Sequence, residues 1–362
     1  MSEHSHGFEV PVQVRSERFK SEDPAAFGEI SNRDEQWRYL PSERLGSLIG
    51  QLSAFSGDIA GLPEATVSVA GVGKPEDLVT ARVWEVAKPK HVSLQSDASE
   101  VITVTNSGEA QALRLNITNA PHTKSLLVLN HIGSGELAES VAIDVAPEST
   151  LTVVSIQNMD SASVFFASNF IRVGKNAHLK HIVVSLGGKT VRLVPSVEYA
   201  GPGGTAELRG AYFANGDQHL EHRPFIDHNQ PNCVSDVAYK GALQGAKAHT
   251  VWVGDVLIRK EAEGTKTYEL NRNLLLTDGA RADSVPNLEI ETGQIEGAGH
   301  ASASGRFDDE QLFYLQARGI SELEAMRLVV KGFLNDVISQ IGVQSLENEL
   351  NAIIESKLEG VN

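Results

Sequence analysis

The sequence is poor in cysteine, because Cys233 is the single one among 362 residues. One cysteine cannot form a disulfide within the chain, so nothing indicates a secreted scaffold held together by disulfides. A single thiol also cannot build a Cys-rich zinc site or hold an iron–sulfur cluster without help. The sequence therefore excludes a chain that owns such a centre by itself.

Basic residues are also scarce, since 31 Lys and Arg stand against 47 Asp and Glu, which gives a formal net charge of −16. This acidity argues against binding to nucleic acid or to an anionic membrane surface. No apolar run approaches the length of a membrane span, and the N-terminal MSEHSHGFEV lacks the basic and apolar regions of a signal peptide. These absences predict a soluble, cytoplasmic protein with no membrane and no nucleic-acid partner.

The length suggests two or three domains of roughly 150 residues each, and the residue pattern divides the chain into three zones. We expect a mixed N-terminal region of short helices and loops over residues 1–85, because glycine and proline interrupt it repeatedly. Within it, Ser42 is predicted to cap a short helix over 44–52. A strand-rich core is expected over 86–305 and a helical C-terminal domain over 306–362.

The middle zone carries β-branched runs bounded by turn residues, which is typical of an all-β fold. No helix-period segment separates these runs, which argues against alternating βαβ units. The segment 146–154 is similar to the segment 174–182. A further step of the same length along the chain reaches residues 201–210, where a turn cluster again leads into a strand. A fixed offset between strands is what a β-solenoid shows, since each coil packs mainly on its neighbours. The pattern therefore favours a solenoid slightly over a β-sandwich.

The last zone shows the apolar spacing of amphipathic helices. Ser321 with Glu324 forms a capping box, and Gly319 is placed to end the preceding helix, which is expected to bury its apolar residues, Phe313 among them. Apolar residues at three- and four-residue spacing predict a helix over 322–341. The predicted buried stripe consists of Leu323, Met326, Val330, Phe333, Leu334, Val337 and Ile341.

Four residues with metal-ligating atoms lie close together in the sequence: His219, His222, His228 and Cys233. In a strand, however, His219 and His222 point to opposite faces. Polar neighbours can satisfy these imidazoles, so a structural role is favoured and a metal site is the alternative. A lone cysteine in a strand-rich zone is more often a small buried hydrophobe.

Three further patterns are better explained by structure than by chemistry. The GKT in residues 186–191 lacks the first glycine of a phosphate-binding loop, so ATP binding by that route is not expected. Asn271 and Asn273 are predicted to bond the backbone of adjacent coils. Ser302 shares a strand face with His300, but nothing supplies an oxyanion hole for such a nucleophile.

Four segments carry a likeness to a known family, and the run DEQLFYLQARGI followed by EAMRLVVKGF is the most specific part of it. Together they resemble the SufB/SufD family, whose members are subunits of the SUF iron–sulfur cluster assembly machinery. The NRNLLL motif and the modest length resemble the SufD branch. The segments occur in the family's order at 32–41, 228–241, 268–290 and 284–333.

The resemblance implies a mainly β fold, a right-handed parallel β-helix flanked by N- and C-terminal helical regions. It also implies two partners: a SufB-type subunit bound through the β-helix and a SufC-type ABC ATPase bound through the C-terminal helices. The docking surface for the ATPase is assigned to Gln311, Tyr314, Arg318, Gly319 and Glu324.

One histidine is the metal-ligand candidate that the resemblance implies. SufD-type chains often read Cys-Ser-His-Gly before the terminal helices, and this chain has Ala298, Gly299, His300 and Ala301 there. The resemblance places His300 at the SufB–SufD interface as an iron or cluster ligand, which an imidazole can be. With Ala298 at the cysteine position, thiolates would come from the partner. No cofactor is expected to be held by this chain alone, and a nascent iron–sulfur cluster would be shared with SufB.

The function implied is that of a non-enzymatic scaffold, and two alternatives stay open. Many parallel β-helices are carbohydrate-active enzymes, which need a groove of carboxylates and aromatics, whereas aromatic residues make up 6% of this chain. The other alternative is a purely structural solenoid that associates with itself, and a homodimer outside the full complex is left open.

Overall fold

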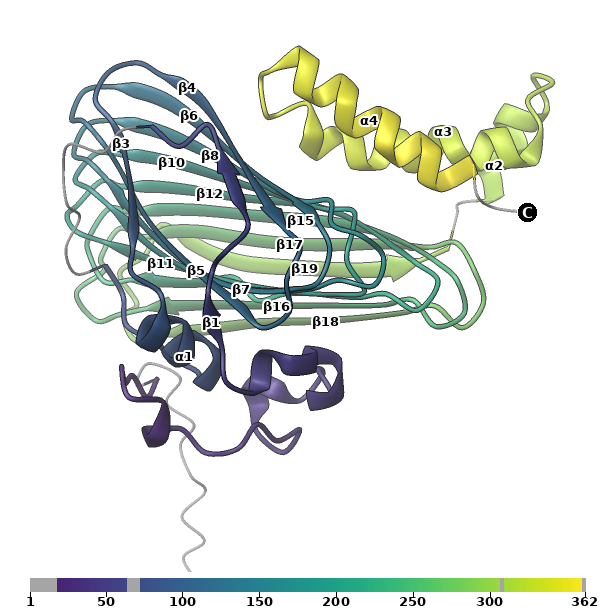
Figure 1. The fold of residues 1–362 in the computed structure, drawn as a ribbon. Helices are drawn as coiled ribbons and strands as arrows, with labels where there is room; N and C mark the ends of the chain where they lie inside the picture. The colour runs from purple at the N-terminus through teal and green to yellow at the C-terminus, as the bar shows by residue number, and fades with distance from the viewer. Residues whose placement is uncertain (1–17, 64–71, 307–308, 360–362) are drawn as a thin grey trace, which may run out of the picture.

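Two stacked parallel sheets form the centre of the molecule (Figure 1). The computed structural model describes residues 18–63, 72–306 and 309–359. Consecutive strands alternate between the two sheets, except that the strands at 219–222 and 225–228 share one sheet. All strands but the one at 58–60 pair in parallel with a strand one coil away. The result is a β-solenoid of about eight turns with helices near both termini. The predicted fold class is thus confirmed.

The bounds of the strands follow this alternation. The first sheet contains β1 (Ser53–Ala54), β3 (Lys90–Leu94), β5 (Gln111–Asn119), β7 (Glu136–Val145), β9 (Val164–Val173), β11 (Thr190–Tyr199), β13 (His219–His222), β14 (Phe225–His228), β16 (His249–Ile258) and β18 (Arg281–Ile290). The second sheet contains β2 (Asp58–Ala60), β4 (Ser99–Asn106), β6 (Lys124–Gly133), β8 (Thr150–Gln157), β10 (His178–Ser185), β12 (Thr205–Asn215), β15 (Val234–Gln244), β17 (Lys266–Leu275) and β19 (Gly297–Gly305). Strand β2 runs antiparallel to β4.

The repeat seen in the sequence corresponds to one coil of the solenoid. Leu151 in β8 pairs with Leu179 in β10, and these two residues hold equivalent places in the repeated segments. Leu179 pairs in turn with Ala206 in β12, slightly earlier than a strict repeat would place the partner. Because paired residues of parallel strands share a face, apolar positions stack from coil to coil into a continuous interior.

Strands in the middle of the solenoid are buried on both faces. In β10, Leu179 and Val183 face the interior, whereas Ile182 and Val184 face outward beneath helices. This explains why the middle strands read as continuous apolar runs rather than as alternating ones. Each such fully buried aliphatic side chain contributes roughly 1.5–3 kcal/mol to folding.

Three C-terminal helices are α2 (Asp309–Gln316), α3 (Glu322–Ile338) and α4 (Gln344–Glu359). Helices α3 and α4 pack on the outer face of the second sheet, with Val330, Leu334 and Val337 buried against it. An ion pair between Lys240 and Asp336 fastens α3 to β15. The capping box of Ser321 and Glu324 is confirmed, whereas α3 ends at Ile338 rather than at residue 341.

The N-terminal region covers the opposite side, the outer face of the first sheet (Figure 1). It comprises three 3₁₀ segments and a helix, η1 (Pro24–Ala26), η2 (Glu35–Trp37), η3 (Ser42–Ile49) and α1 (Leu78–Val86). Trp37, Leu45 and Val83 pack there against Ala138 and Phe166. The prediction that Ser42 caps a helix is wrong, because η3 begins at Ser42 and follows Pro41 without a side-chain cap.

None of the helices in the described part of the chain combines the length and the apolar content that a membrane crossing requires.

Candidate functional site

The last strand of the second sheet, β19, forms one end of the solenoid. It pairs with β17 on one side, and no other described strand pairs with its outer edge. Backbone N–H and C=O groups along that edge are therefore available to another strand. In the first sheet β18 has the same position, because it pairs only with β16 among the described strands.

His300 lies in the middle of this end strand, and its side chain is exposed. It is in register with the buried Glu269 of β17, so both side chains lie on the same face of the sheet. Ser304 shares this face, and its Oγ accepts a 3.1 Å hydrogen bond from Nδ2 of the buried Asn273. The face that carries His300 therefore continues the interior of the solenoid out to its open end.

The neighbouring carboxyl group, Glu269, is buried without a salt-bridge partner. Neither of its oxygens has a hydrogen-bond partner among the described residues. Burial, assisted by the negative charge of Asp255, raises the pKa of Glu269 to about 8. The coil directly behind His300 therefore holds a neutral carboxylic acid at pH 7.

A chain of polar side chains runs through the interior toward this end. Asn271 Nδ2 donates to the Tyr212 hydroxyl at 2.8 Å, and that hydroxyl lies 2.7 Å from Asn273 Oδ1. Asn273 Nδ2 donates to Asn271 Oδ1 at 2.8 Å as well as to Ser304. Asn271 also donates to the backbone carbonyl of Tyr239 in the adjacent coil at 3.2 Å, as predicted. Asn273 instead bonds side chains, and through Ser304 it joins the end strand to coils farther inside.

The histidines near Cys233 do not meet. His219 lies on the outer face of the first sheet, whereas His222 and His228 lie inside the solenoid, each hydrogen-bonded to a serine. Burial lowers the pKa of both interior rings to about 3. Cys233 is buried too, and burial raises its pKa. Across the described ranges no three His, Cys, Asp or Glu side chains gather closely enough to hold a metal ion.

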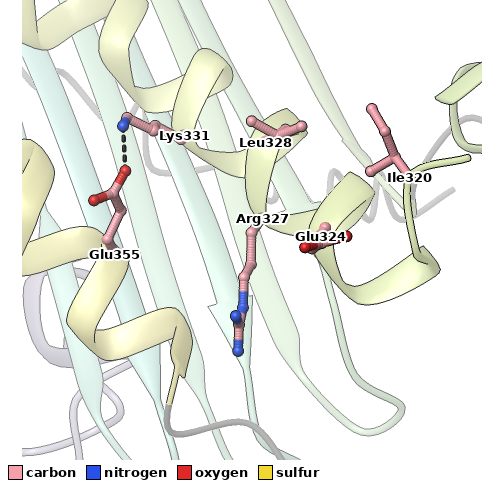
Figure 2. A pocket seen from close by; sticks show the side chains of 6 residues that line it. All are labelled: Ile320, Glu324, Arg327, Leu328, Lys331 and Glu355. Carbon is pink, nitrogen blue, oxygen red and sulfur yellow. Dashed lines mark hydrogen bonds and ion pairs between the residues drawn. The ribbon is translucent and has the colours of Figure 1, made fainter. Parts of the chain in front are cut away.

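A second candidate surface lies on the C-terminal helices, where a pocket of about 400 Å³ opens between α3 and α4 (Figure 2). The ion pair between Lys331 and Glu355 connects the two helices at one side of it. The lining residues are Ile320, Glu324, Arg327, Leu328, Lys331 and Glu355.

Large apolar side chains are exposed on α2 and α3, and one of them, Leu328, lines the pocket. Their exposed fractions are 71% for Phe313, 56% for Tyr314, 39% for Leu323 and 52% for Leu328. The prediction that Phe313 and Leu323 are buried is therefore wrong. The reason is that α2 packs on α3 and not on the sheet. These four residues and the pocket together are called the α2–α3 patch below.

Most residues assigned to ATPase docking fall in or next to this patch. The guanidinium of Arg318 lies 4.5 Å from the centre of the Tyr314 ring, and Gly319 ends α2 with a φ of +84°. Glu324 lines the pocket, and hydrogen bonds from Ser321 lower its pKa. Gln311 falls within α2, but its side chain lies outside the described part of the chain.

Sequence reasoning missed several residues of the patch. Arg327 and Lys331 are neighbours on one face of α3, but only the packing of α3 on α4 brings Glu355 to them. Leu328 did give a signal in the sequence, since it is an apolar residue that lies off the predicted stripe of its helix.

These features define a class of protein: a β-solenoid with an open end strand and a separate helical module that leaves an apolar patch exposed. Residues 101–333 match the family model described as SUF system FeS cluster assembly, SufBD core domain. The chain belongs to the SufBD family.

Individual relatives agree with this assignment. The chain is 44% identical to an iron–sulfur cluster assembly SufBD family protein of Mycobacterium tuberculosis, with 95% of this chain and 93% of the relative covered. It is 43% identical to a SufBD family protein of Mycobacterium leprae over 94% and 93% of the two chains. It is 24% identical to the iron–sulfur cluster assembly protein SufD of Escherichia coli over 91% and 89%.

Proposed function

We propose that this chain is a SufD-type, non-enzymatic scaffold subunit of the cytoplasmic SUF machinery for iron–sulfur cluster assembly. The observation that carries the proposal is the SufBD family match over residues 101–333. Two further features support it, the open end strand with His300 and the exposed α2–α3 patch.

The open end of the solenoid suits a SufB-type partner. An unpaired strand edge offers backbone hydrogen bonds to a second strand, and pairing would bury β18 and β19 together. In such a pair His300 would lie at the junction of the two solenoids. The cargo, iron with sulfide, would meet an imidazole from this chain and thiolates from its partner, because the residues along β19 include no cysteine.

The α2–α3 patch suits a SufC-type ATPase. An apolar surface rimmed by charged side chains is typical of a protein interface, whose centre buries aromatic and aliphatic residues. Helix α3 is also joined to the solenoid through the Lys240–Asp336 ion pair, and the turn after it through a 3.1 Å hydrogen bond from Arg209 Nε to Gln340 Oε1. Movement of two bound ATPase subunits toward each other would therefore act on the solenoids and open their junction to iron and sulfide.

Affinity purification of the tagged chain from its own cells tests the assembly. We expect a SufB-type subunit and an ABC-type ATPase to be recovered with it. Recovery of the chain without any ABC-type ATPase would contradict the proposal.

The role of His300 is tested by comparing His300→Ala with Ser302→Ala, which changes another exposed residue on the same face of β19. We expect both variants to assemble with their partners, and we expect iron and sulfide loading of the complex to fall only in the histidine variant. A His300→Ala complex that assembles and loads normally would end the ligand proposal.

A further inference from the structure

A cation-lined cleft lies on the outer face of the first sheet, on a different part of the molecule from the two surfaces discussed so far. Its volume is about 450 Å³, within the range of small-molecule sites. The N-terminal region forms one wall and the starts of β13, β16 and β18 form the other. Its titratable residues include Arg38, Arg44, His219, Lys247, His249 and Arg281.

The charge of this cleft opposes that of the whole chain, because four Lys and Arg side chains line it in a protein of net charge −16. Within the described ranges Lys247 forms no ion pair, and Arg38 contacts only the ring of Tyr39. Arg281 is paired with Asp283 at 2.8 Å, and Arg44 donates to a backbone carbonyl. Two cations therefore face the cleft without a neutralising partner among those residues.

The floor of the cleft is a hydrogen-bonded pair of imidazoles between two carboxylates. His219 Nε2 lies 3.4 Å from Glu221, and His249 Nε2 lies 2.7 Å from Asp283. The two Nδ1 atoms lie 3.1 Å apart. All four ring nitrogens are therefore engaged, either with each other or with a carboxylate.

Neighbouring charges hold this arrangement in place. Although burial opposes it, Arg192, His219 and Arg223 keep the pKa of Glu221 well below its usual range. The Glu221 carboxylate also accepts hydrogen bonds from Arg192 and Arg223. Burial lowers the pKa of His249.

We propose that this cleft binds a small polyanion of the phosphate class, with a diphosphate group held by Arg38 and Lys247. Guanidinium forks and an ammonium suit phosphate oxygens, and two cations without a neutralising partner favour a ligand with more than one negative charge. The site does not depend on the proposed function, because none of its residues belongs to β19 or to the α2–α3 patch.

Isothermal titration of the full chain with inorganic pyrophosphate at constant ionic strength tests the site. We expect saturable binding of one pyrophosphate per chain. The double variant Arg38→Ala with Lys247→Ala should weaken it at least tenfold. The matched control, Lys124→Ala with Lys260→Ala, removes two charges outside the cleft and should bind as the unchanged chain does.

Two further titrations identify the ligand class. Tighter binding of ADP than of pyrophosphate would support a nucleotide as the source of the diphosphate, and the reverse order would support the free anion. Citrate that binds as tightly as pyrophosphate would overturn the phosphate assignment. An absence of saturable pyrophosphate binding, or equal losses in the two double variants, would overturn the site itself.

Discussion

At the scale of single residues, the scarcity of thiols has a definite structural meaning. Cys233 is buried, its thiol lies near backbone carbonyl oxygens, and burial raises its pKa, so it is a poor source of thiolate. Position 298 on the end strand is alanine, and it packs partly into the interior. His300 brings an imidazole, a common type of metal ligand, to the exposed part of the end strand.

Glu269 gives a prediction about pH. Its carboxyl group keeps its proton up to about pH 8 in the folded chain, whereas the ordinary pKa of such a group is 4.5. The folded state therefore binds more protons between these values, and this group lowers stability as the pH rises through that window. Glu269→Gln should remove this loss. Between pH 5 and pH 8 its free energy of unfolding should rise by up to about 4 kcal/mol relative to that of the unchanged chain.

Chemical denaturation at the two pH values measures that gain. Glu296→Gln, at an exposed position before β19, is the matched control and should change little. A stability difference for Glu269→Gln that does not vary with pH would show that the buried carboxyl group is not protonated.

Gly210 gives a prediction about packing. A Cβ atom at this position in β12 would collide with the ring of Tyr239, which stacks beside it in the next coil. Gly210→Ala should therefore lower the free energy of unfolding by about 1–3 kcal/mol, the usual cost of overpacking a core. Gly293→Ala is the control, because nothing lies within 4 Å of its Cβ position. Equal stabilities of the two variants in denaturant titrations would contradict this view of the interior.

At the scale of elements, the C-terminal helices show what periodicity can and cannot tell. The stripe predicted for α3 is correct at Val330, Leu334 and Val337, which meet the sheet. It fails at Leu323, which is 39% exposed in the first turn of α3. An apolar residue that awaits a partner protein has the same spacing as one that packs inside the chain, so sequence alone does not separate them.

The α2–α3 patch gives a prediction at this scale. Leu328→Asp places a charge at the centre of the proposed interface and should weaken binding of the SufC-type ATPase at least tenfold, or about 1.4 kcal/mol. The fold should be kept because Leu328 is half exposed. Val101→Asp changes a comparably exposed residue on β4 and should leave binding unchanged. Affinities for the ATPase can be measured by surface plasmon resonance. Equal affinities of Leu328→Asp and Val101→Asp would show that the patch is not part of the interface.

At the scale of the whole molecule, the arrangement separates three surfaces. The N-terminal region covers one sheet, α3 and α4 cover the other, and the end strands stay open (Figure 1). In the proposed function, a movement of α3 would reach the open end through the stack of coils, which parallel ladders and the interior polar chain join. The Lys240–Asp336 ion pair and the contact of Arg209 with Gln340 lie on that route.

Much of this architecture was accessible from the sequence, because coil-to-coil stacking imposes a nearly constant offset on similar residues. The offset between segments 146–154 and 174–182 marked the pairing of β8 with β10. Later coils are longer, as the pairing of Thr267 with Ala298 shows, and the repeat could not be followed there. That this last strand lies at a partner interface was indicated only by the family resemblance. The cationic cleft was invisible, because its residues come from separate stretches of sequence that only the fold brings together.

The most direct test of the central claim is native mass spectrometry of the chain co-expressed with SufB-type and SufC-type subunits. We expect the unchanged chain to form a complex that contains both partners. Leu328→Asp should keep the SufB-type subunit and lose the ATPase subunit bound to this chain. His300→Ala should keep both partners and lower only the bound iron and sulfide. A chain that forms no complex with either partner, or a Leu328→Asp chain that still binds its ATPase subunit, would contradict the account.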